Sequence, residues 1–410
     1  MNILSSLLLL AVGLPMAYLY LLALASVRTR STRPTQQARH CFAIAIPAHN
    51  EEAVIGHTVT TLQQLDYPSH LFEIHVVADH CTDHTAEVAH TAGAIVHQRH
   101  EGARSGKGAA LRWLFQRLLN SEPETLSPRS YDAVVVLDAD TQVAPDFLRV
   151  MDTRLSEGDQ VIQGQHRISN PDDGWFPALT WAMFTVDNRF QNLGRSNLGW
   201  SAKNMGDSIC FRADVPRRLG WGEGLTEDYA FRQRLLLEGI KIRYEPAAVG
   251  YGQAPLTWRA ARDQRARWLR GTHDASQRYG RQLLRKGLRR RDLALLDGAL
   301  QACLPSYSSL TLITLAAFGV QLALRIWDLR LGTWDLALAI SPLLLTLWAL
   351  VMGALVIYPF LGLVLERAPL KAYLIILSGP VFVLWRTWLA LTSRLRRRQI
   401  DWVRTPRKVQ

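Results

Sequence analysis

Long apolar stretches lie near both ends of the chain and enclose a middle of mixed polarity. The first, from Ile3 to Ala25, has the length of about twenty residues that a helix needs to cross a bilayer. Two more run from Leu304 to Ile326 and from Leu336 to Tyr358. A fourth, from Tyr373 to Leu391, is interrupted by Arg386. This pattern predicts a central domain between N-terminal and C-terminal transmembrane helices.

Short apolar runs alternate with amphipathic helical patterns through the middle of the chain. The predicted strands cover residues 42–46, 73–78, 94–97 and 133–138, and the predicted helices cover 51–65, 83–92, 107–119 and 146–155. Strands and helices in alternation at this spacing predict an α/β domain with a mostly parallel sheet and helices on both faces. Ligands of such sheets bind where the strands end at their carboxyl edges.

Polar clusters follow three of the predicted strands: "PAHNEE" at 47–52, "DHCTD" at 79–83 and "DAD" at 138–140. In extended chain, Asp138 and Asp140 would point to the same side, where two carboxylates repel each other unless a cation lies between them. Hard oxygen ligands suit Mg²⁺ or Mn²⁺, which can also hold a diphosphate. The pair therefore predicts a divalent-metal site, with Asp140 the more direct ligand. For this motif alone, a solvated turn after a strand is the alternative.

Two further positions on this rim could contact a bound molecule. Asp79 ends its strand, where its carboxylate could accept a hydrogen bond from a nucleobase. Lys107 lies in "GARSGKGAAL", which lacks the spacing and the Ser or Thr of a Walker A loop. At the start of a helix, Lys107 could still meet a phosphate or a sugar, or it could simply face solvent.

The segment "VADHCTDHTAEVAH" brings His80, Cys81, His84 and His90 close together in the sequence. Tetrahedral zinc needs a second pair of ligands elsewhere, so we do not expect a zinc site here. The four cysteines of the chain are scattered, without metal or disulfide spacing, which indicates a reducing compartment.

Two later segments carry candidate chemistry. In "GLTEDYAFRQRLLLEG", Glu227 and Asp228 open a helical pattern, where acidic residues ordinarily complement the helix dipole. A carboxylate at that position can also act as a general base if a hydroxyl reaches it. In "DQRARWLRG", Gln264, Arg267 and Trp268 share one helical face and could together stack on a sugar or base and hold a phosphate. A basic amphipathic helix lying on the membrane is the alternative.

The net charge of +12 is concentrated in residues 28–39, 259–291 and 386–408, each next to an apolar segment. This placement suits anionic lipid headgroups, whereas a basic groove with interleaved aromatic residues, typical of nucleic-acid binding, is absent from the sequence. By the positive-inside rule, the arginines after the first apolar segment place the middle of the chain in the cytoplasm. The basic tail should share that side, so we expect 373–391 to be re-entrant or interfacial.

These features divide the chain into five parts. They are an N-terminal transmembrane anchor at 1–27, a cytoplasmic α/β domain at 40–255, basic interfacial helices at 256–298, C-terminal transmembrane or interfacial helices at 299–392, and a basic cytoplasmic tail at 393–410. The first apolar segment is long and no Lys or Arg precedes it, which favours an uncleaved anchor over a signal peptide.

Taken in order, "PAHNEE", "VVADHCTDHTA", "GKGAAL", "VVVLDADTQVAPDFL", "GLTEDYAFRQRLLLEG" and "QRARW" resemble the membrane-bound family 2 glycosyltransferases. That family includes cellulose, chitin, hyaluronan and poly-N-acetylglucosamine synthases and many bacterial exopolysaccharide transferases. The resemblance covers residues 42–270 and implies a GT-A nucleotide-sugar domain. It also implies inverting transfer from a nucleoside-diphosphate sugar, foremost a UDP-sugar, at a bacterial inner membrane.

The resemblance assigns roles to individual residues. Asp228 of "TED" would be the catalytic base, and Asp138 with Asp140 would bind Mg²⁺ or Mn²⁺. The residues that would bind the donor are Pro47, Glu51, Asp79, Lys107, Asp138, Gln264, Arg265, Arg267 and Trp268. The last four match the Q-x-x-R-W signature, which would hold the donor diphosphate and line the acceptor site.

Three functions are compatible with the sequence. The leading one is sugar transfer to a growing polysaccharide or glycan acceptor in exopolysaccharide biosynthesis. The second is a single transfer to a polyprenyl phosphate or another membrane lipid. The chain has fewer clear membrane helices than cellulose or hyaluronan synthases, which argues against a built-in export channel. The third is a non-catalytic membrane sensor of nucleotide sugars, which would need only the D-x-D pair. Since the T-E-D and Q-x-x-R-W motifs are also present, the sequence favours an enzyme.

Overall fold

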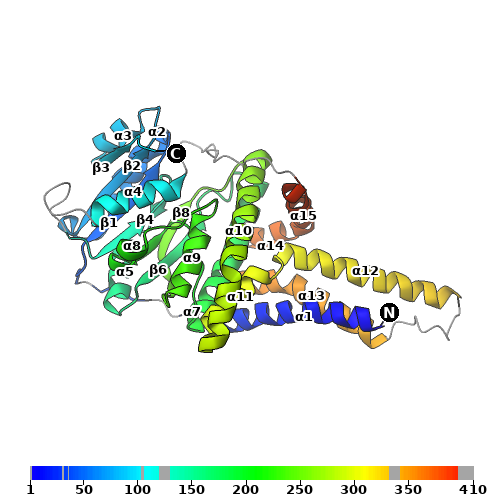
Figure 1. Ribbon diagram of the computed structural model, residues 1–410. Coiled ribbons are helices and arrows are strands. Elements are labelled where there is room, and N and C mark those ends of the chain that lie inside the picture. The colour runs from blue at the N-terminus through cyan, green and yellow to red at the C-terminus, as the bar shows by residue number, and fades with distance from the viewer. Residues whose placement is uncertain are drawn as a thin grey trace.

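The computed structural model describes residues 2–29, 32–35, 37–102, 106–119, 130–331 and 342–395. Within these residues, the central domain holds an eight-stranded sheet in the order β3-β2-β1-β4-β7-β6-β8-β5 (Figure 1). The strands are β1 Phe42–Ala48, β2 Phe72–Asp79, β3 Ile95–Arg99, β4 Ala133–Val136, β5 Gln142–Val143, β6 Val161–Ile168, β7 Ile209–Arg212 and β8 Ile242–Gly252. The first four correspond to the strands that the apolar runs predict.

The predicted α/β class with a mostly parallel sheet is confirmed. β1 pairs in parallel with β2 and β4, and the pairs β2–β3 and β6–β8 are parallel too. β7 lies antiparallel between β4 and β6, and the short β5 is antiparallel to β8. Because β1, β2 and β4 run in one direction, the polar segments after them meet at one rim of the sheet.

Helices cover both faces of the sheet and connect it to the apolar ends of the chain. They are α1 Asn2–Ala25, α2 Glu52–Leu62, α3 Thr85–Thr91, α4 Lys107–Leu119, α5 Phe147–Ser156, α6 Trp175–Asp187, α7 Gly194–Asn197, α8 Asp214–Leu219, α9 Glu227–Leu237, α10 Trp258–Arg290, α11 Leu293–Cys303, α12 Tyr307–Leu331, α13 Pro342–Leu365, α14 Leu370–Ile376 and α15 Gly379–Leu395. The four helices predicted in the first half correspond to α2, α3, α4 and α5. Helix α10 is continuous over 33 residues and lies between the sheet and the apolar helices (Figure 1).

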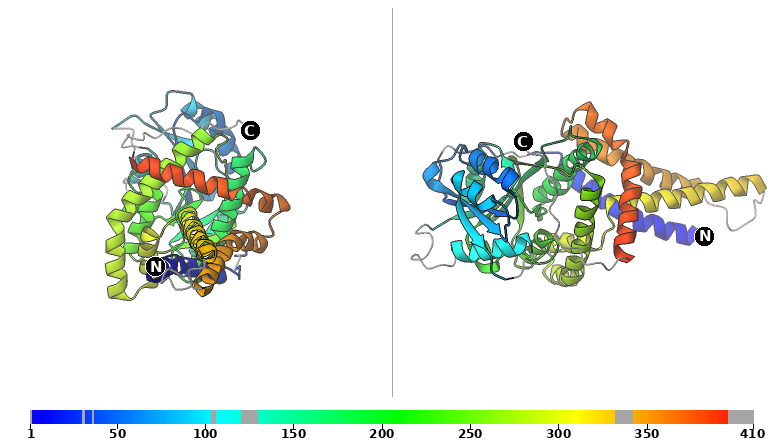
Figure 2. Two further views of the ribbon diagram at one scale, coloured as in Figure 1. Left: turned by 90° about the vertical axis from the view of Figure 1, so that its right-hand side faces the viewer. Right: turned by 90° about the horizontal axis from the view of Figure 1, so that it is seen from above.

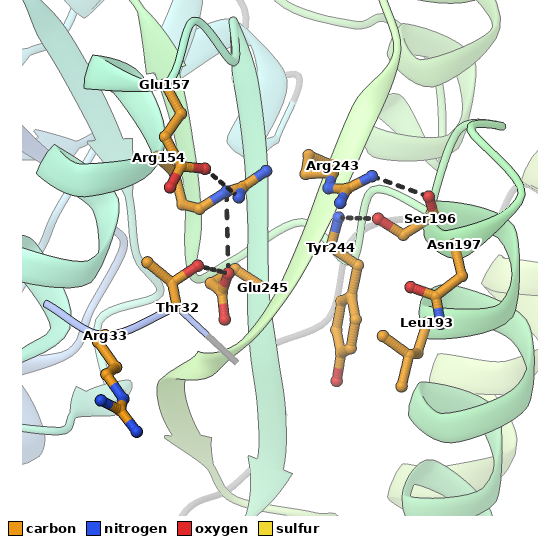
Figure 3. A pocket seen from close by; sticks show the side chains of 10 residues that line it. All are labelled: Thr32, Arg33, Arg154, Glu157, Leu193, Ser196, Asn197, Arg243, Tyr244 and Glu245. Carbon is orange, nitrogen blue, oxygen red and sulfur yellow. Dashed lines mark hydrogen bonds and ion pairs between the residues drawn. The ribbon is translucent and has the colours of Figure 1, made fainter. Parts of the chain in front are cut away.

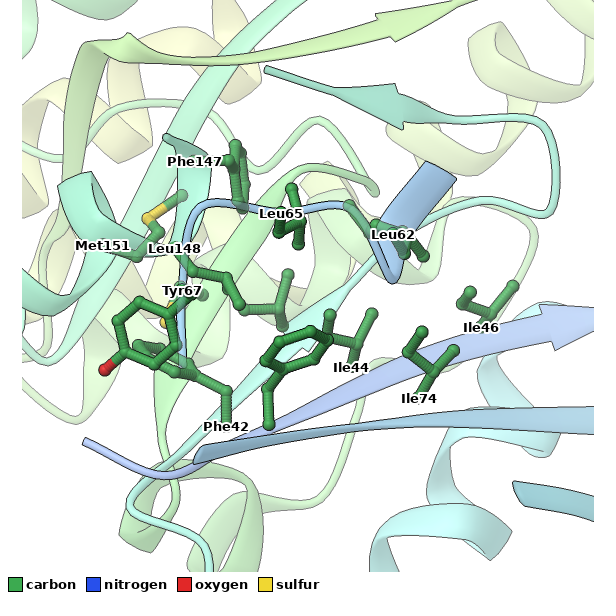
Figure 4. Close-up of a cluster of buried hydrophobic side chains, with 14 of the residues drawn as sticks. Phe42, Ile44, Ile46, Leu62, Leu65, Tyr67, Ile74, Phe147, Leu148 and Met151 are labelled. Carbon is green, nitrogen blue, oxygen red and sulfur yellow. The ribbon is translucent and has the colours of Figure 1, made fainter. Parts of the chain in front are cut away.

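Strand β1 runs through the middle of the core, and both of its faces are buried. Phe42, Ile44 and Ile46 pack on one face against side chains of α2 and α5, the cluster shown in Figure 4. The two alanines between them belong to the core on the other face, which α4 covers. Burying one Phe or Ile side chain contributes roughly 1.5–3 kcal/mol, so this alternation fixes the strand and the rim that follows it.

Three of the described helices contain stretches long and apolar enough to cross a membrane: Ser5–Ala25 in α1, Tyr307–Ile326 in α12 and Pro342–Leu365 in α13. They project from one end of the domain, and α13 packs against both α1 and α12 (Figure 1). They correspond to the first three apolar stretches of the sequence, although residues 336–341 of the third stretch lie outside the described residues.

The fourth apolar stretch forms two helices, α14 and α15, which are bent by 49° at a short break. A broken span and a re-entrant loop both have this form, so the expected interfacial placement of 373–391 stays a prediction. Figure 2 shows α15 crossing the direction of α12 and α13 in both views. Residues 396–410 of the basic tail lie outside the described residues.

A buried ion network joins α1 to the catalytic domain. Both carboxylate oxygens of Asp297 in α11 lie 3.1–3.2 Å from Arg195 Nε, and Oδ2 lies 3.5 Å from Arg232 Nη2 in α9. The Tyr18 hydroxyl of α1 donates to Asp297 Oδ1 at 2.5 Å, and Gln301 Nε2 donates to Oδ2 at 2.6 Å. The three charged side chains are at most 1% exposed. The anchor helix is therefore held to α9 through polar side chains that water does not reach.

Candidate active site

Lys107, Asp138 and Gly206 meet at the rim where β4 ends. Lys107 is the first residue of α4, and its Nζ donates to Asp138 Oδ1 and, at 2.6 Å, to the carbonyl oxygen of Gly206. Burial lowers the pKa of Lys107, but the nearby carboxylates, above all Asp138 and Glu227, outweigh burial and raise it. The side chain of Asp138 is 40% exposed and that of Lys107 only 16%. A fixed positive charge therefore lies behind an accessible carboxylate.

The "DAD" motif lies in a turn. Strand β4 ends at Val136, and the Thr141 N–H donates to the carbonyl of Asp138 at 3.0 Å, which closes the turn. The expectation that Asp138 and Asp140 lie in extended chain is therefore wrong, because the chain leaves the strand before Asp138. Asp138 and Asp140 are both partly exposed at the rim.

The acidic residues of this rim do not form a metal site by themselves. Within the described ranges, no group of three or more His, Cys, Asp or Glu side chains could hold a metal ion. Mg²⁺ and similar ions are, however, often held by one or two carboxylates together with substrate phosphates. Asp138 and Asp140 fit such an ion, shared with a bound diphosphate.

Asp79, the predicted nucleobase contact, is buried at the end of β2. Its Oδ1 accepts hydrogen bonds from Arg99 of β3 and, at 2.8 Å, from His80 Nδ1. Its carbonyl oxygen accepts from His49 Nδ1 at 2.7 Å, which joins the ends of β1 and β2. A nucleobase that bonds the Asp79 carboxylate would therefore share it with Arg99.

Pro47 and Glu51 lie on the same rim as Asp79. Pro47 pairs with Val77 in the parallel ladder of β1 and β2. Glu51 is buried just before α2, and its N–H donates to Thr85 Oγ1 at 2.7 Å. These bonds fix the loop after β1 against the start of α3.

Glu227 and Asp228 open α9 on the other side of Gly206. Gly206 has a φ of +87°, and a Cβ there would lie 3.2 Å from Asp228 Oδ2, so only glycine fits without strain. Burial raises the pKa of both carboxylates, and repulsion by Asp228 adds to the effect on Glu227, whose pKa is about 7. A carboxylate whose pKa is raised is better suited to accept a proton from a hydroxyl.

Helix α10 brings part of the Q-x-x-R-W signature to these carboxylates. A Cβ on Gly271 would lie 2.6–2.7 Å from atoms of Thr226, so α10 crosses the start of α9 at very close range. The positive charge of Arg267 partly offsets the rise in the pKa of Glu227 and Asp228, so the Arg267 guanidinium lies near these two carboxylates.

Arg265, in contrast, is buried in an aromatic cluster. Its guanidinium carbon lies 5.6 Å from the ring centres of Phe176 and Trp268 and 5.1 Å from that of Phe382. The cluster also contains Trp175, Trp258 and Trp385, from α6, α10 and α15. Among the described residues, Arg265 has contacts with these rings and none with Lys107 or Asp138. Gln264 and Trp268 are half-buried on α10, and among the described residues no hydrogen bond joins either of them to that pair.

The sequence analysis missed a buried pair beneath the metal motif. Asp207 Oδ2 accepts hydrogen bonds at 3.0 Å from Thr141 Oγ1, next to Asp140, and from His166 Nδ1 of β6. Burial opposes ionisation of Asp207, but His166 holds its pKa below the usual range. Asp207 thereby fixes the turn that carries Asp138 and Asp140. The segment "NMGDS" matches no motif, and only an acid directly after Gly206 and before an apolar run could have drawn attention to it.

The fold matches that of known nucleotide-sugar enzymes. A mannosyltransferase from Pyrobaculum calidifontis, solved with GDP-Man and Mn²⁺, aligns over 96% of this chain and 97% of its own with a TM-score of 0.55 and 16% identity. The domain is thus a GT-A fold. Residues 38–271 match the family described as "Glycosyltransferase like family 2", and the chain belongs to this family of enzymes.

The similar proteins are named as glycosyltransferases or synthases, and the names of the synthases describe different products. The probable glycosyltransferase YdaM of Bacillus subtilis is 25% identical over 89% of this chain and 86% of its own length. A β-monoglucosyldiacylglycerol synthase of Synechocystis is 30% identical over 61% of this chain, and a poly-β-1,6-N-acetyl-D-glucosamine synthase of Staphylococcus epidermidis is 25% identical over 56%. The chain spans only 50% and 54% of the lengths of these two synthases.

Proposed function

We propose that this enzyme transfers a sugar, with inversion, from a nucleoside-diphosphate sugar, foremost a UDP-sugar, to a growing polysaccharide or glycan acceptor at the inner membrane. The observation that carries the proposal is the arrangement around Gly206. Lys107 bonds its carbonyl oxygen, and Asp228 lies against its α-carbon. Lys107, a cation that can bind a diphosphate, and Asp228, a base that can accept a hydroxyl proton, thus lie on two sides of Gly206.

In the proposed reaction, Asp228 accepts the proton of the acceptor hydroxyl. The hydroxyl oxygen forms a bond to the anomeric carbon while the bond from that carbon to the diphosphate oxygen breaks, and the electron pair leaves with the nucleoside diphosphate. Lys107 and Arg267 contribute positive charge that stabilises the leaving diphosphate. Asp140 and Asp138 would hold a Mg²⁺ or Mn²⁺ ion, which would supply further neutralisation of that charge.

The membrane arrangement belongs to the same proposal. Residues 40–255 form the catalytic domain on the cytoplasmic side, and 256–298 lie between this domain and the bilayer. The anchor at 1–27 and the helices within 299–392 hold the enzyme in the membrane. The three apolar spans and the tie between Tyr18 and Asp297 support this arrangement.

A membrane lipid is the second candidate acceptor, and two observations favour it. The aromatic cluster around Arg265 joins α10 to α15, so apolar side chains lie between the signature helix and the membrane-associated helices. The relatives named β-monoglucosyldiacylglycerol synthases have names that describe a lipid product. The glycan acceptor draws its support from the relatives named poly-N-acetylglucosamine synthases.

The test is release of nucleoside diphosphate by membranes that contain the full chain. UDP- and GDP-sugars are supplied with Mg²⁺, Mn²⁺ or a chelator, and the labelled product is divided between organic extract and high-molecular-mass polymer. We expect one donor to turn over and both Asp140→Asn and Asp228→Asn to abolish turnover. The matched control is Asp214→Asn, an exposed carboxylate on α8. Donor binding without turnover, even with lipid extract added, would support the sensor instead.

A further inference from the structure

Two adjoining pockets lie on the part of the domain that faces the apolar helices. The larger has a volume of about 590 Å³ and the smaller about 260 Å³, and Leu193 and Tyr244 line both. Figure 3 shows the larger pocket, between the β8 residues around Tyr244, the end of α5, the end of α7 and the linker that holds Arg33. None of the residues assigned above to sugar transfer lines either pocket.

The pocket walls are fixed at the ends of two apolar spans. Asn197 Nδ2 donates to the carbonyl oxygens of Ala25 and Arg28, both at 2.9 Å, just where α1 ends. Arg189 donates to the Val27 carbonyl at 2.8 Å and lies 3.1 Å from Glu366, directly after α13. If α1 and α13 cross a bilayer, both pockets therefore open at the level of the lipid headgroups.

The charge of the pockets is positive. Six arginines and three glutamates line them: Arg33, Arg154, Arg167, Arg189, Arg243, Arg367, Glu157, Glu245 and Glu366. Ion pairs with carboxylates already engage Arg154 and Arg189. The other four arginines have no carboxylate partner among the described residues.

Arg33 and Arg243 line the larger pocket, and Arg167 and Arg367 line the smaller. Arg243 donates to the Ser196 carbonyl at 2.9 Å, and Arg167 donates to Gln165 Oε1 at 2.9 Å. Arg243 directly precedes Tyr244, which lines both pockets. The side chains of Arg33 and Arg367 make no hydrogen bond or ion pair with another described residue. Unpaired guanidinium groups in a pocket are suited to bind a phosphate bidentately.

We propose that the two pockets together bind the phosphate-bearing headgroup of an anionic membrane phospholipid. The position favours a lipid over a soluble anion, because the exposed apolar side chains of Leu21, Leu24 and Val27 lead along α1 toward the linker that lines the larger pocket. An acyl chain can lie on that face while the headgroup enters the pocket. Basic pockets beside transmembrane helices bind anionic headgroups in this way. The proposal does not depend on which acceptor the enzyme uses.

The test is lipid binding by the delipidated full chain in detergent, followed by native mass spectrometry. Dioleoylphosphatidylglycerol is titrated against dioleoylphosphatidylcholine, with sn-glycerol 3-phosphate as soluble competitor. Each arginine near a lipid surface contributes about fivefold to affinity, so Arg167→Gln with Arg243→Gln should weaken phosphatidylglycerol binding about thirtyfold. The control is Arg218→Gln, an exposed arginine on α8, which should leave binding unchanged.

A second pair of substitutions keeps the test decisive if the first variant does not fold. Arg33→Gln with Arg367→Gln removes two exposed side chains that have no partners among the described residues, so folding should be unaffected and phosphatidylglycerol binding should again fall. Equal binding of the two lipids, or an equal loss in Arg218→Gln, would overturn the proposal. Displacement of the lipid by millimolar sn-glycerol 3-phosphate would also overturn it and would indicate a soluble phosphate ligand.

Discussion

Replacing Asp297 by Asn should destabilise the whole catalytic domain, because it removes the only carboxylate of the buried network with Arg195 and Arg232. The asparagine has almost the same shape, so packing is retained and the change is one of charge. Both guanidinium groups are at most 1% exposed and lie within 3.5 Å of the carboxylate. Breaking a buried ion pair by removing one partner costs about 3–5 kcal/mol. For a domain of this size, this loss corresponds to a fall in melting temperature of roughly 6–20 °C.

The assay is thermal unfolding of the detergent-solubilised full chain, followed by circular dichroism. Asp292→Asn is the matched control on the same helix, because Asp292 caps the N-terminus of α11 and asparagine caps equally well. The control should melt within about 2 °C of the wild type, given that such caps differ by a few tenths of a kcal/mol. If Asp297→Asn melts no lower than Asp292→Asn, the network does not carry the stability that its burial indicates.

Three further changes test the site itself. Gly206→Ala should slow nucleoside-diphosphate release about tenfold or more, because its Cβ would press on Asp228 at a φ of +87°; Gly224→Ala, with a φ of +95° in open space, controls for backbone strain. Lys107→Met should raise the KM for the donor about tenfold, with partial rescue in Lys107→Arg, as donor titrations will show. Burial raises the pKa of Glu227 from 4.5 to about 7, so the stability linked to it is complete below pH 4.5 and lost as the pH rises through 7. Glu227→Gln should therefore melt higher than the wild type at pH 8 but not at pH 4, and equal melting at pH 8 would contradict this.

The strands of the first half could be predicted because each is a short apolar run followed by a segment with clear helical periodicity. Residues 42–46 are the clearest case, since both faces of β1 are buried. β6 and β7 are harder, because "VIQGQHRI" buries polar side chains that bond the neighbouring loop. Gln163 Nε2, for example, donates to the Asp207 carbonyl at 2.8 Å. A buried glutamine of this kind breaks the apolar alternation on which the prediction of a strand depends.

The candidate site likewise has some contacts that the sequence predicts and others that it does not. Lys107 and Asp138 could be expected to share a rim, because each adjoins the end of a predicted strand or the start of a helix. The bond of Asp207 to Thr141 joins segments 66 residues apart, and no periodicity reports such a contact. Helical spacing puts Gln264, Arg267 and Trp268 on one face, but it does not say that Arg265 lies among the rings of α6 and α15.

Helix α9 links the chemistry to the membrane. It begins at the site with Asp228 and, one helical turn later, places Arg232 in the buried network with Asp297, which also binds Tyr18 of α1. Because Asp228 and Arg232 are one turn apart on the same helix, the proposed base is held at a constant distance from α1. An acceptor that is itself confined to the membrane surface would then meet the base at a fixed distance from that surface. This geometry gives a reason for a polar connection, buried at a cost, between the α/β domain and an apolar helix.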